Sequence, residues 1–365
     1  MNKCTLIIDG NWLLISRFSV LYNDFKVDLS KEELERSKEN LKDMIARSIN
    51  NILNRLPAID NIILVSDGGS WRKSLPIPTQ LTTKYKENRE HKSEIAWDYV
   101  FGTLNDLQEN FKEAGITTSY GQNIEGDDWC WYWSRKLNNE GISCIIWTSD
   151  HDIMQLIQSK NYIFTAWYNE RSNKSTLVFP SCLESKEPDP NDFDAFMFMP
   201  QQNTPLMESL MKSSNVVEYI NPNEIINEKI ICGDSGDNIK SVARVIKNGR
   251  NYGVGKSEWK KLSNKLNINT IYDLIDKSQK ISEEISRIKK FKDNTTAIDV
   301  KEMIDYNIKL VWLNEGVIPA DIQSKMNEQE YKTIDIDYFR NSYKSIFGNK
   351  EPEIKEISDI FDGID

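Results

Sequence analysis

The sequence predicts an α/β fold whose core is a parallel sheet. Two observations lead to this prediction. Short apolar runs of strand length recur three times between residues 4 and 150. Longer segments with apolar residues at helical spacing separate these runs, and strands that alternate with helices are typical of a parallel α/β sheet.

The predicted core elements have clear boundaries. In chain order we expect a strand at 4–9, a helix at 30–56, a strand at 61–67, a helix at 93–115 and a strand at 142–150. The first helix opens with a capping box, Ser30 to Glu33. The second ends at Gly115, a residue type that commonly closes helices.

The rest of the chain is divided by composition. Residues 183–230 are Pro-rich and acidic, and we interpret them as an excursion from the core. Residues 231–346 are basic at first and then contain amphipathic helical segments, and 347–365 form an acidic tail. The resulting prediction is a core over 1–182, a variable segment, a helical region and a tail.

Composition excludes several classes of protein. Hydrophobic residues make up 39% and charged residues 28%, so the chain should bury a sizeable core. No apolar run is long enough to span a membrane, and Asp9 interrupts the first one, so neither a membrane helix nor a signal peptide is expected. The five cysteines form no CxxC pair, which favours free thiols in a cytoplasmic protein. With only two histidines, a zinc site or a Ser-His-Asp triad is not expected.

Charge is distributed unevenly along the chain. A formal net charge of −10 taken alone argues against a nucleic-acid partner. Two segments are nevertheless basic, and their cations are Arg72, Lys73, Lys84, Lys86, Arg89 and Lys92 in the first and Lys240, Arg244, Lys247, Arg250, Lys256, Lys260 and Lys261 in the second. Either segment alone would be interpreted as ordinary solvated surface, but two of them in an acidic chain form a pattern that needs an explanation.

Each of the three predicted core strands ends on an aspartate: Asp9, Asp67 and Asp150. The carboxyl ends of parallel strands share one edge of a sheet, so the three carboxylates should converge there. Further acids accompany them at Glu125, Asp127, Asp128 and Asp152, and another pair follows at Asp234 and Asp237. Oxygen ligands without His or Cys favour Mg²⁺ or Mn²⁺. The sequence therefore predicts a divalent-metal site.

The stretch EGDDWCWYWSRKL, residues 125–137, permits a second interpretation of its acids. Acidic residues suit helix N-termini and often serve only as caps. The agreement with three strand-end aspartates favours metal binding instead. Trp129, Trp131 and Trp133 follow these acids, and we expect them to pack in the core rather than to stack on bases.

Taken together, the motifs resemble those of the 5′-nuclease or flap-endonuclease superfamily, above all its phage 5′→3′ exonuclease and ribonuclease H members. The matching pieces run in family order: IDGN (8–11), VSDGGSWRKSL (65–75), YKENR (85–89), EGDDW (125–129), TSDHDIMQL (148–156), GDSGDNI (233–239) and YNIKLVWL (306–313). The resemblance implies a PIN-like, resolvase-like sheet with helices on both faces, a helical arch around 71–92 and a helical duplex-binding region over 231–346.

The resemblance also implies roles for individual residues. The metal ligands would be Asp9, Asp67, Glu125, Asp127, Asp150, Asp152, Asp234 and Asp237, with Asp128 as an accessory acid. Lys86 and Arg89 would meet the scissile phosphate, Tyr85 would stack on the terminal base, and Arg72 would contact phosphate. Lys240, Lys256 and Lys260 would bind the duplex backbone.

The implied function is hydrolysis of phosphodiester bonds at 5′ ends, flaps or RNA primers during DNA replication, with two metal ions. The implied partners are branched or nicked DNA and RNA–DNA hybrids, bound by a monomer in the cytoplasm of a cell or of a phage host. The tail could dock on a sliding clamp through Ile357, Ile360 and Phe361, although a solvated tail is favoured; a single-strand-binding protein is another expected partner. The alternatives are a PIN-like ribonuclease acting on single strands and a non-catalytic binder of DNA structures.

Overall fold

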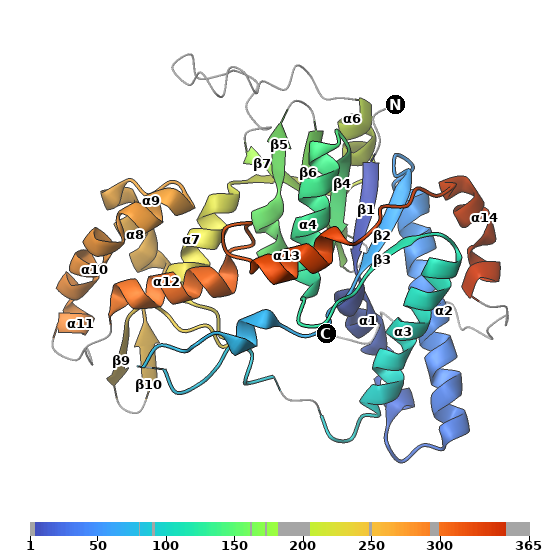
Figure 1. Cartoon of the computed structure of the whole chain (residues 1–365), viewed down its shortest axis with the longest axis horizontal. Helices are drawn as coiled ribbons and strands as arrows, with labels where there is room; N and C mark the ends of the chain where they lie inside the picture. Colours follow the sequence, from blue (N-terminus) through green and yellow to red (C-terminus); the bar gives the residue numbers. More distant parts are fainter. Residues whose placement is uncertain are drawn as a thin grey trace.

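A central sheet organises the molecule (Figure 1). The computed structural model describes residues 4–79, 81–89, 92–160, 163–171, 174–181, 205–247, 250–292 and 299–347. The strands of the main sheet are β1 (Cys4–Asp9), β2 (Asn61–Val65), β3 (Thr117–Ser119), β4 (Ser143–Trp147), β5 (Gln158–Lys160), β6 (Ile163–Arg171), β7 (Lys174–Pro180) and β8 (Val216–Ile220).

The predicted parallel sheet is confirmed at its centre. The strand order is β3-β2-β1-β4-β6-β7-β8, and the pairs from β3 to β6 are parallel. β7 runs antiparallel to β6, and β5 pairs with β6 off this path. In register, Asp9 lies opposite Val65 and Ile8 lies opposite Trp147, so β1, β2 and β4 end at the same edge.

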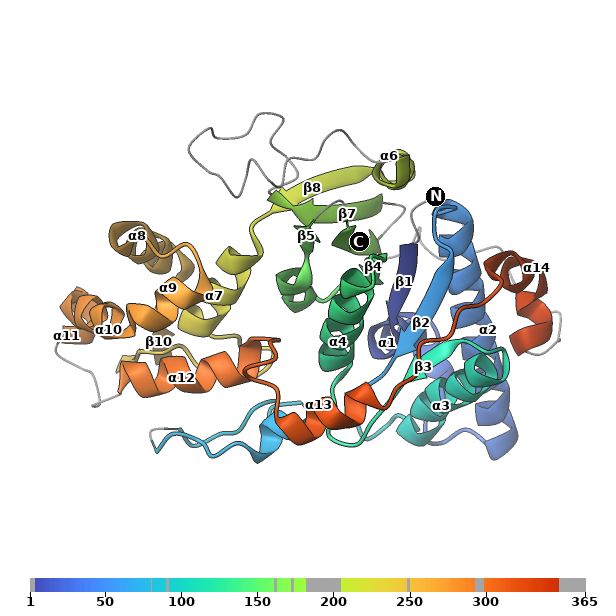
Figure 2. The same ribbon diagram turned by 45° about the horizontal axis from the view of Figure 1, so that its top comes forward.

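Helices cover both faces of the sheet, as expected. The helices of the core are α1 (Gly10–Phe18), α2 (Lys31–Arg55), α3 (Trp97–Glu113), α4 (Gly126–Asn139) and α6 (Pro205–Lys212), joined by the 3₁₀ turns η1 (Tyr22–Phe25), η2 (Trp71–Ser74) and η3 (His151–Leu156). Alternate residues of a strand point to opposite faces. Leu6 and Ile8 accordingly pack in the cluster with α1, α2 and α3, whereas Ile7 packs in the cluster with α4 (Figures 1 and 2).

A second, mainly helical body lies beside the carboxyl edge of the sheet (Figure 2). It contains α7 (Pro222–Cys232), a hairpin of β9 (Arg244–Lys247) and β10 (Arg250–Gly253), α8 (Lys256–Leu266), α9 (Ile271–Asp276), α10 (Ser278–Arg287), α11 (Lys289–Lys292) and α12 (Val300–Val311). These elements share their own apolar cluster, which includes Ile230, Leu274 and Met303. Tyr85 and Leu81 from the first basic segment also pack in it.

The structure corrects two of the expected boundaries. Residues 205–220 are no excursion, because α6 contributes Leu206 and Leu210 to the core and β8 pairs with β7 at the sheet edge. Residues 314–347 leave the helical body and return to the core. Their helices are α13 (Ala320–Asn327) and α14 (Ile336–Phe347).

α14 is fixed to the core by both apolar and polar contacts. Phe339 is buried and its ring stacks on Phe111 of α3 at 6.1 Å. Arg340 donates hydrogen bonds to the carbonyls of Leu53 and Ile59 at the end of α2. The amphipathic pattern of 336–347 was visible in the sequence, but the partner of its apolar face was not.

The arch expected around 71–92 is not a helical arch in the described part of that segment. It contains the short η2 and, from Lys84 to Arg89, turns with no α-helix. Pro76 and Pro78 lie between the two parts, and proline interrupts helical hydrogen bonding. Lys86 has a left-handed backbone with φ 54°, which also breaks helical geometry.

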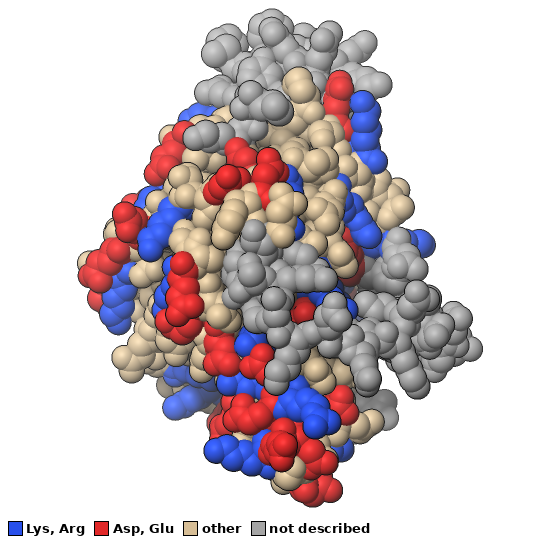
Figure 3. Space-filling model, turned by 90° about the vertical axis from the view of Figure 1, so that its right-hand side faces the viewer, with Lys and Arg blue, Asp and Glu red and all other residues tan. Residues whose placement is uncertain are grey.

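The surface over α2, α3 and α14 carries both signs of charge. In Figure 3, Lys and Arg alternate with Asp and Glu across the coloured part of this face. Several of these charges form ion pairs on the helices, such as Lys42 with Glu39 and Arg47 with Asp43. Within the described ranges, no helix combines the length and hydrophobicity needed to cross a membrane.

Candidate active site

The strand-end aspartates meet at one edge of the sheet, as the spacing predicted. Asp9 caps α1 by accepting a hydrogen bond from Trp12 N at 3.0 Å. Thr148 connects two of the acids, because its hydroxyl donates to Asp9 Oδ2 at 2.8 Å and accepts from Asp150 N at 3.0 Å. Asp67 accepts from Gly126 N at the start of α4 at 2.5 Å, which places Asp127 beside the same group.

These carboxylates influence one another electrostatically. Burial, followed by the charges of Asp67 and Asp150, raises the pKa of Asp9 to about 7. Burial and the charge of Asp150 also raise the pKa of Asp127 well above its usual range. Carboxylates that oppose each other's ionisation in this way stay charged together only if a cation joins them.

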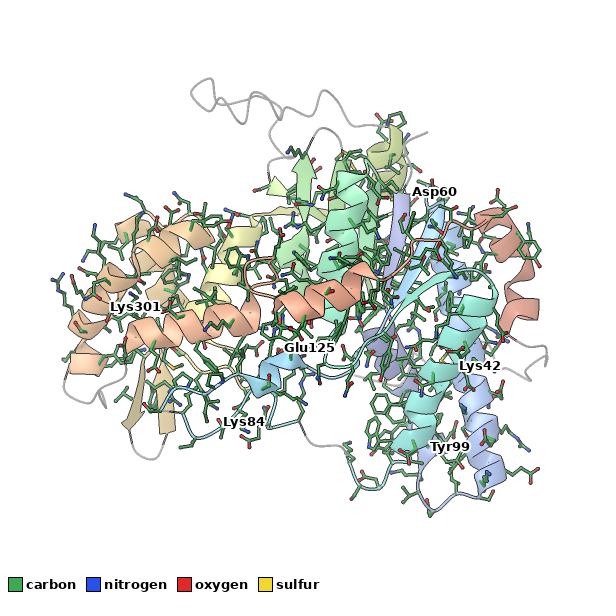
Figure 4. The ribbon with its side chains drawn as sticks, in the orientation of Figure 1. Lys42, Asp60, Lys84, Tyr99, Glu125 and Lys301 are labelled. Atoms are coloured by element: carbon green, nitrogen blue, oxygen red, sulfur yellow. The ribbon has the colours of Figure 1, made fainter. Side chains whose placement is uncertain are left out.

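The acids at the beginning of α4 differ from the strand-end aspartates, because they belong to a buried ion-pair network around Arg72. Arg72 donates to Asp128 Oδ1 at 2.7 Å and to Glu125 Oε2 at 2.8 Å, and its side chain is 1% exposed. Trp71 Nε1 adds a bond to Asp128 at 3.1 Å, and Ser70 adds one to Glu125 at 2.8 Å. Figure 4 shows Glu125 at the junction of η2 and α4.

This network corrects two expected roles. Arg72 lies inside the protein and its guanidinium bonds to two carboxylates and the Leu310 carbonyl, so it does not face a phosphate. Asp128 is fully buried and both of its oxygens already accept hydrogen bonds, so it stabilises Arg72 instead of offering a ligand for a metal. The sequence could not show this pairing because the two residues are more than 50 positions apart.

The tryptophans after the acidic triplet pack in the core, as predicted. Trp129, Trp131 and Trp133 are all buried in the cluster between α4 and the sheet. Trp133 also donates from Nε1 to Ser119 on β3 at 2.8 Å. Their bulk anchors α4 and so fixes the position of the acids at its first turn.

The basic segment 84–89 closes over the acids. Lys86 Nζ lies 2.5 Å from Glu125 Oε1, and Arg89 lies 2.5 Å from Asp237 Oδ1. The backbone is attached as well, since Lys86 N donates to the Asp237 carbonyl and Asn238 donates to the Lys84 carbonyl. In Figure 4, Lys84 lies on the segment of chain that passes near the hairpin β9–β10.

Tyr85 occupies a different place from the one expected. It is buried in the apolar cluster of the helical body, 5% exposed, with Lys86 Nζ 4.9 Å from its ring centre. A ring enclosed in this way does not offer a face to a terminal base. Its burial joins the basic segment to the helical body.

A second carboxylate group contains Asp152, Asp234 and Asp237, which we call the aspartate triad. Each offers an oxygen, and the three oxygens all lie within 4.8 Å of one another. Asp152 N donates to Asp150 Oδ1 at 2.8 Å, so the triad adjoins the strand-end acids. Asp234 and Asp237 are held by a turn in which Gly233 has φ +76°, a conformation that favours glycine.

Lys229 of α7 is the residue that sequence reasoning missed. Its Nζ contacts Asp152 and lies 2.9 Å from Asp234 Oδ2. Although burial opposes it, the charge of Asp152 raises the pKa of Lys229. The one available signal was its position, one helical turn before Gly233 and the final acidic pair.

The lysines that we expect to bind duplex differ in their exposure to solvent. Lys256 and Lys260 are exposed on α8, four positions apart and therefore on one face. Lys256 forms an ion pair with Glu228 at 2.6 Å. Lys240 is half-buried and donates to Asn238 at 2.5 Å. Their role stays a prediction.

A parallel α/β sheet with a cluster of acids at its carboxyl edge defines the class of α/β domains whose binding site lies at that edge. Comparison with known proteins narrows this class. Residues 4–181 match the family model described as the 5′-3′ exonuclease, N-terminal resolvase-like domain. The similarity to 5′-3′ exonucleases thus covers the part of the chain that contains the strand-end aspartates and α4.

Individual relatives are distant. A 5′-3′ exonuclease of Mycoplasmopsis pulmonis is 23% identical over 328 residues, which cover 88% of this chain and 84% of that protein. Among solved structures, the 5′-exonuclease of T5 with bound zinc has a TM-score of 0.52 at 15% identity, over 95% of this chain and 100% of that one. The flap endonuclease of bacteriophage T5, in a complex with DNA and metal ions, has a TM-score of 0.53 at 15% identity, over 94% and 99%. The structural likeness shows that the fold is shared.

Proposed function

We propose that this protein is a metal-dependent 5′-nuclease that hydrolyses phosphodiester bonds at 5′ ends, flaps or RNA primers in DNA replication. The observation that carries the proposal is a pair of adjoining carboxylate groups under a basic segment. The groups are Asp9, Asp67, Asp127 and Asp150 on one side and Asp152, Asp234 and Asp237 on the other. The similar proteins named above as 5′-3′ exonuclease and flap endonuclease support it.

The donor set fits divalent ions of the Mg²⁺ or Mn²⁺ kind, because it consists of carboxylate oxygens at close range. We infer two ions, one for each group, and the solved structures with bound metal ions support a metal partner. When bound, such ions activate water and neutralise charge on the leaving oxygen. The protein's part is to hold the carboxylates at fixed strand ends and caps, so that little reorganisation accompanies binding.

Lys86 and Arg89 would act on the substrate phosphate. Both bond to carboxylates of the site, at Glu125 and Asp237, so their charges stand beside the acids that would hold metal. Arg89 keeps 56% of its side chain exposed and is therefore free to turn towards a ligand. Positive groups aimed at non-bridging oxygens lower the energy of a phosphoryl transition state.

The helical body would bind the nucleic acid beyond the cleavage point. Lys256 and Lys260 face solvent on α8, and Lys240 lies on the loop between the aspartate triad and β9. Contacts of this kind neutralise phosphates and release counterions, so affinity should fall steeply with salt. The T5 flap endonuclease in complex with DNA supports a DNA partner. The expected clamp-docking residues of the tail lie outside the described residues.

The experiment that tests the proposal compares three end-labelled substrates, each with Mg²⁺ and with EDTA. They are a 5′-flap duplex, an RNA–DNA hybrid and a single strand. Cleavage from the 5′ side of the flap or hybrid that requires Mg²⁺ is the expected result, and it ranks the substrates.

Two other outcomes would replace the proposal. Cleavage of free RNA alone would make the protein a PIN-like single-strand ribonuclease. Tight binding to the flap without cleavage would make it a binder of DNA structures. The attachment of 84–89 to the 234–238 turn favours the 5′-nuclease, since a single-strand ribonuclease has no need of a closed segment above its acids.

A further inference from the structure

The aspartate triad already contains a cation supplied by the chain. Lys229 Nζ contacts Asp152 Oδ2 and lies 2.9 Å from Asp234 Oδ2 and 3.7 Å from Asp237 Oδ2. Only 10% of the lysine side chain is exposed. The ammonium is thus enclosed by one oxygen from each acid.

Two of the remaining oxygens of the triad accept hydrogen bonds from other groups. Asp234 Oδ1 accepts from Gly236 N at 2.7 Å, and Asp237 Oδ1 accepts from Arg89 at 2.5 Å. On Asp234 and Asp237, the oxygens that face Lys229 are therefore those left to bind a cation. A divalent ion needs carboxylate oxygens at about 2.0–2.6 Å, so it would have to occupy the space of the ammonium.

Lysine is suited to being displaced. Its charge sits at the end of a flexible four-carbon chain, and Lys229 lies in the last turn of α7, next to the Gly233 cap. The carboxylates, in contrast, are held by the η3 cap and by the turn that Asp234 and Ile239 close with paired backbone bonds. Movement of Lys229 is consequently the smaller change.

We propose that Lys229 is a built-in counter-ion that a divalent metal must displace from the aspartate triad, so that the triad loads after, and more weakly than, the strand-end acids. The inference rests on the proposed function, because it assumes that the triad takes a metal. It assigns Lys229 a regulatory role: the lysine keeps three carboxylates together without metal and sets the metal concentration at which the site fills.

The test measures Mn²⁺ binding by calorimetry, without nucleic acid, in the wild type and in Lys229→Met, which keeps an unbranched side chain of nearly the same length but removes its charge. We expect two classes of site in the wild type, and a weaker class that tightens about tenfold or more in the variant, because a unit charge close to the ion is removed. Lys112→Met is the matched control, since Lys112 pairs with Glu109 on the exposed face of α3, and it should bind as the wild type does.

The outcomes separate the two proposals. Unchanged or weaker Mn²⁺ binding in Lys229→Met, in a protein that cleaves its substrate, would overturn the role of Lys229 alone. Absence of both Mn²⁺ binding and cleavage in the wild type would overturn the proposed function.

A second measurement decides the matter if Lys229→Met does not fold. A crystal structure of the wild type in saturating Mn²⁺ should show an ion on the triad and the Lys229 side chain turned away from Asp152. An ion bound to the triad with Lys229 still on Asp152 would contradict displacement. Lys229→Arg, which retains the charge, should keep the weak class of site weak.

Discussion

Two regions of the acidic edge neutralise their charge in different ways. At the start of α4, Glu125 and Asp128 are bonded to Arg72, and Glu125 also to Lys86. At the ends of β1 and β4, by contrast, Asp9 and Asp150 make no ion pair with any Lys or Arg in the described part of the chain. Both regions are acidic, but only the first carries its own cations.

The acids of the two regions differ in the direction in which their pKa is shifted. Although burial alone would raise it, the pKa of Glu125 is lowered to about 2 by Lys86 and Arg72. The pKa of Asp9 is raised to about 7 by burial and by the neighbouring acids. Acids paired with protein cations thus stabilise the structure, whereas unpaired acids leave a site for a cation from solution. The aspartate triad with Lys229 lies between these extremes.

The largest expected effect comes from removing one carboxylate of the unpaired region. Asp150→Ala should lower the cleavage rate by about 10³-fold or more, because loss of a metal ligand removes several kcal/mol of transition-state stabilisation. Binding of flap DNA, measured by fluorescence anisotropy in EDTA, should be retained. Asp106→Ala on α3, whose acid pairs with Lys38 on the surface, is the control. Full turnover in Asp150→Ala would refute the site.

Removing a cation from the paired region should lower the stability of the folded protein. Arg72→Met leaves Glu125 and Asp128 buried without their partner, and breaking a buried pair in this way costs about 3–5 kcal/mol of unfolding free energy. Urea denaturation measures this change. Arg55→Met removes an exposed pair with Glu170 and should cost about 1 kcal/mol or less. Equal effects of the two substitutions would contradict a structural role for Arg72.

Lys86 belongs to the paired region, and its charge also acts on the nearby Asp67 and Asp127. Lys86→Ala should slow single-turnover cleavage by about 10²-fold, the scale of losing one donor to a transition state, and weaken DNA binding far less. The exposed Lys84, two positions away, gives the control Lys84→Ala. A loss of affinity alone would move Lys86 out of the catalytic centre.

The smallest effect is a pH dependence of the metal-free protein. Because the folded pKa of Asp9 is raised to about 7 and that of Asp152 to about 6, their contribution to stability is complete below an unfolded value near 4 and is lost as pH rises through 6 to 7. In EDTA, the melting temperature should therefore fall by a few degrees from pH 5 to pH 8. Added Mg²⁺ should reverse this fall, and a melting temperature that rises with pH in EDTA would contradict it.

Much of the site follows from the order of residues. Asp9, Asp67 and Asp150 each come at or shortly after the end of an apolar run, and the geometry of a parallel sheet brings such positions together whatever the details of packing. The burial of Trp129 and Trp133 agrees with their spacing of four positions on α4. These features depend on local pattern and on one general rule of topology.

Other features depend on which distant segments meet. Whether Arg72 faces solvent or Asp128, whether Tyr85 is exposed, and where α14 packs are settled by contacts between residues far apart in the chain. No local pattern carries that information, because a basic or amphipathic segment is equally compatible with several partners.

The sequence by itself determined the parallel sheet and the acids along its edge, because periodicity and strand ends are local properties. The tertiary structure alone decided which of those acids receive a cation from the protein. Arg72 and Lys86 reach Glu125, and Lys229 reaches Asp152, from segments that only the folded chain brings together. Ion pairing acts over a few ångströms in space and not along the sequence, so the paired and the unpaired acids could be told apart only after folding.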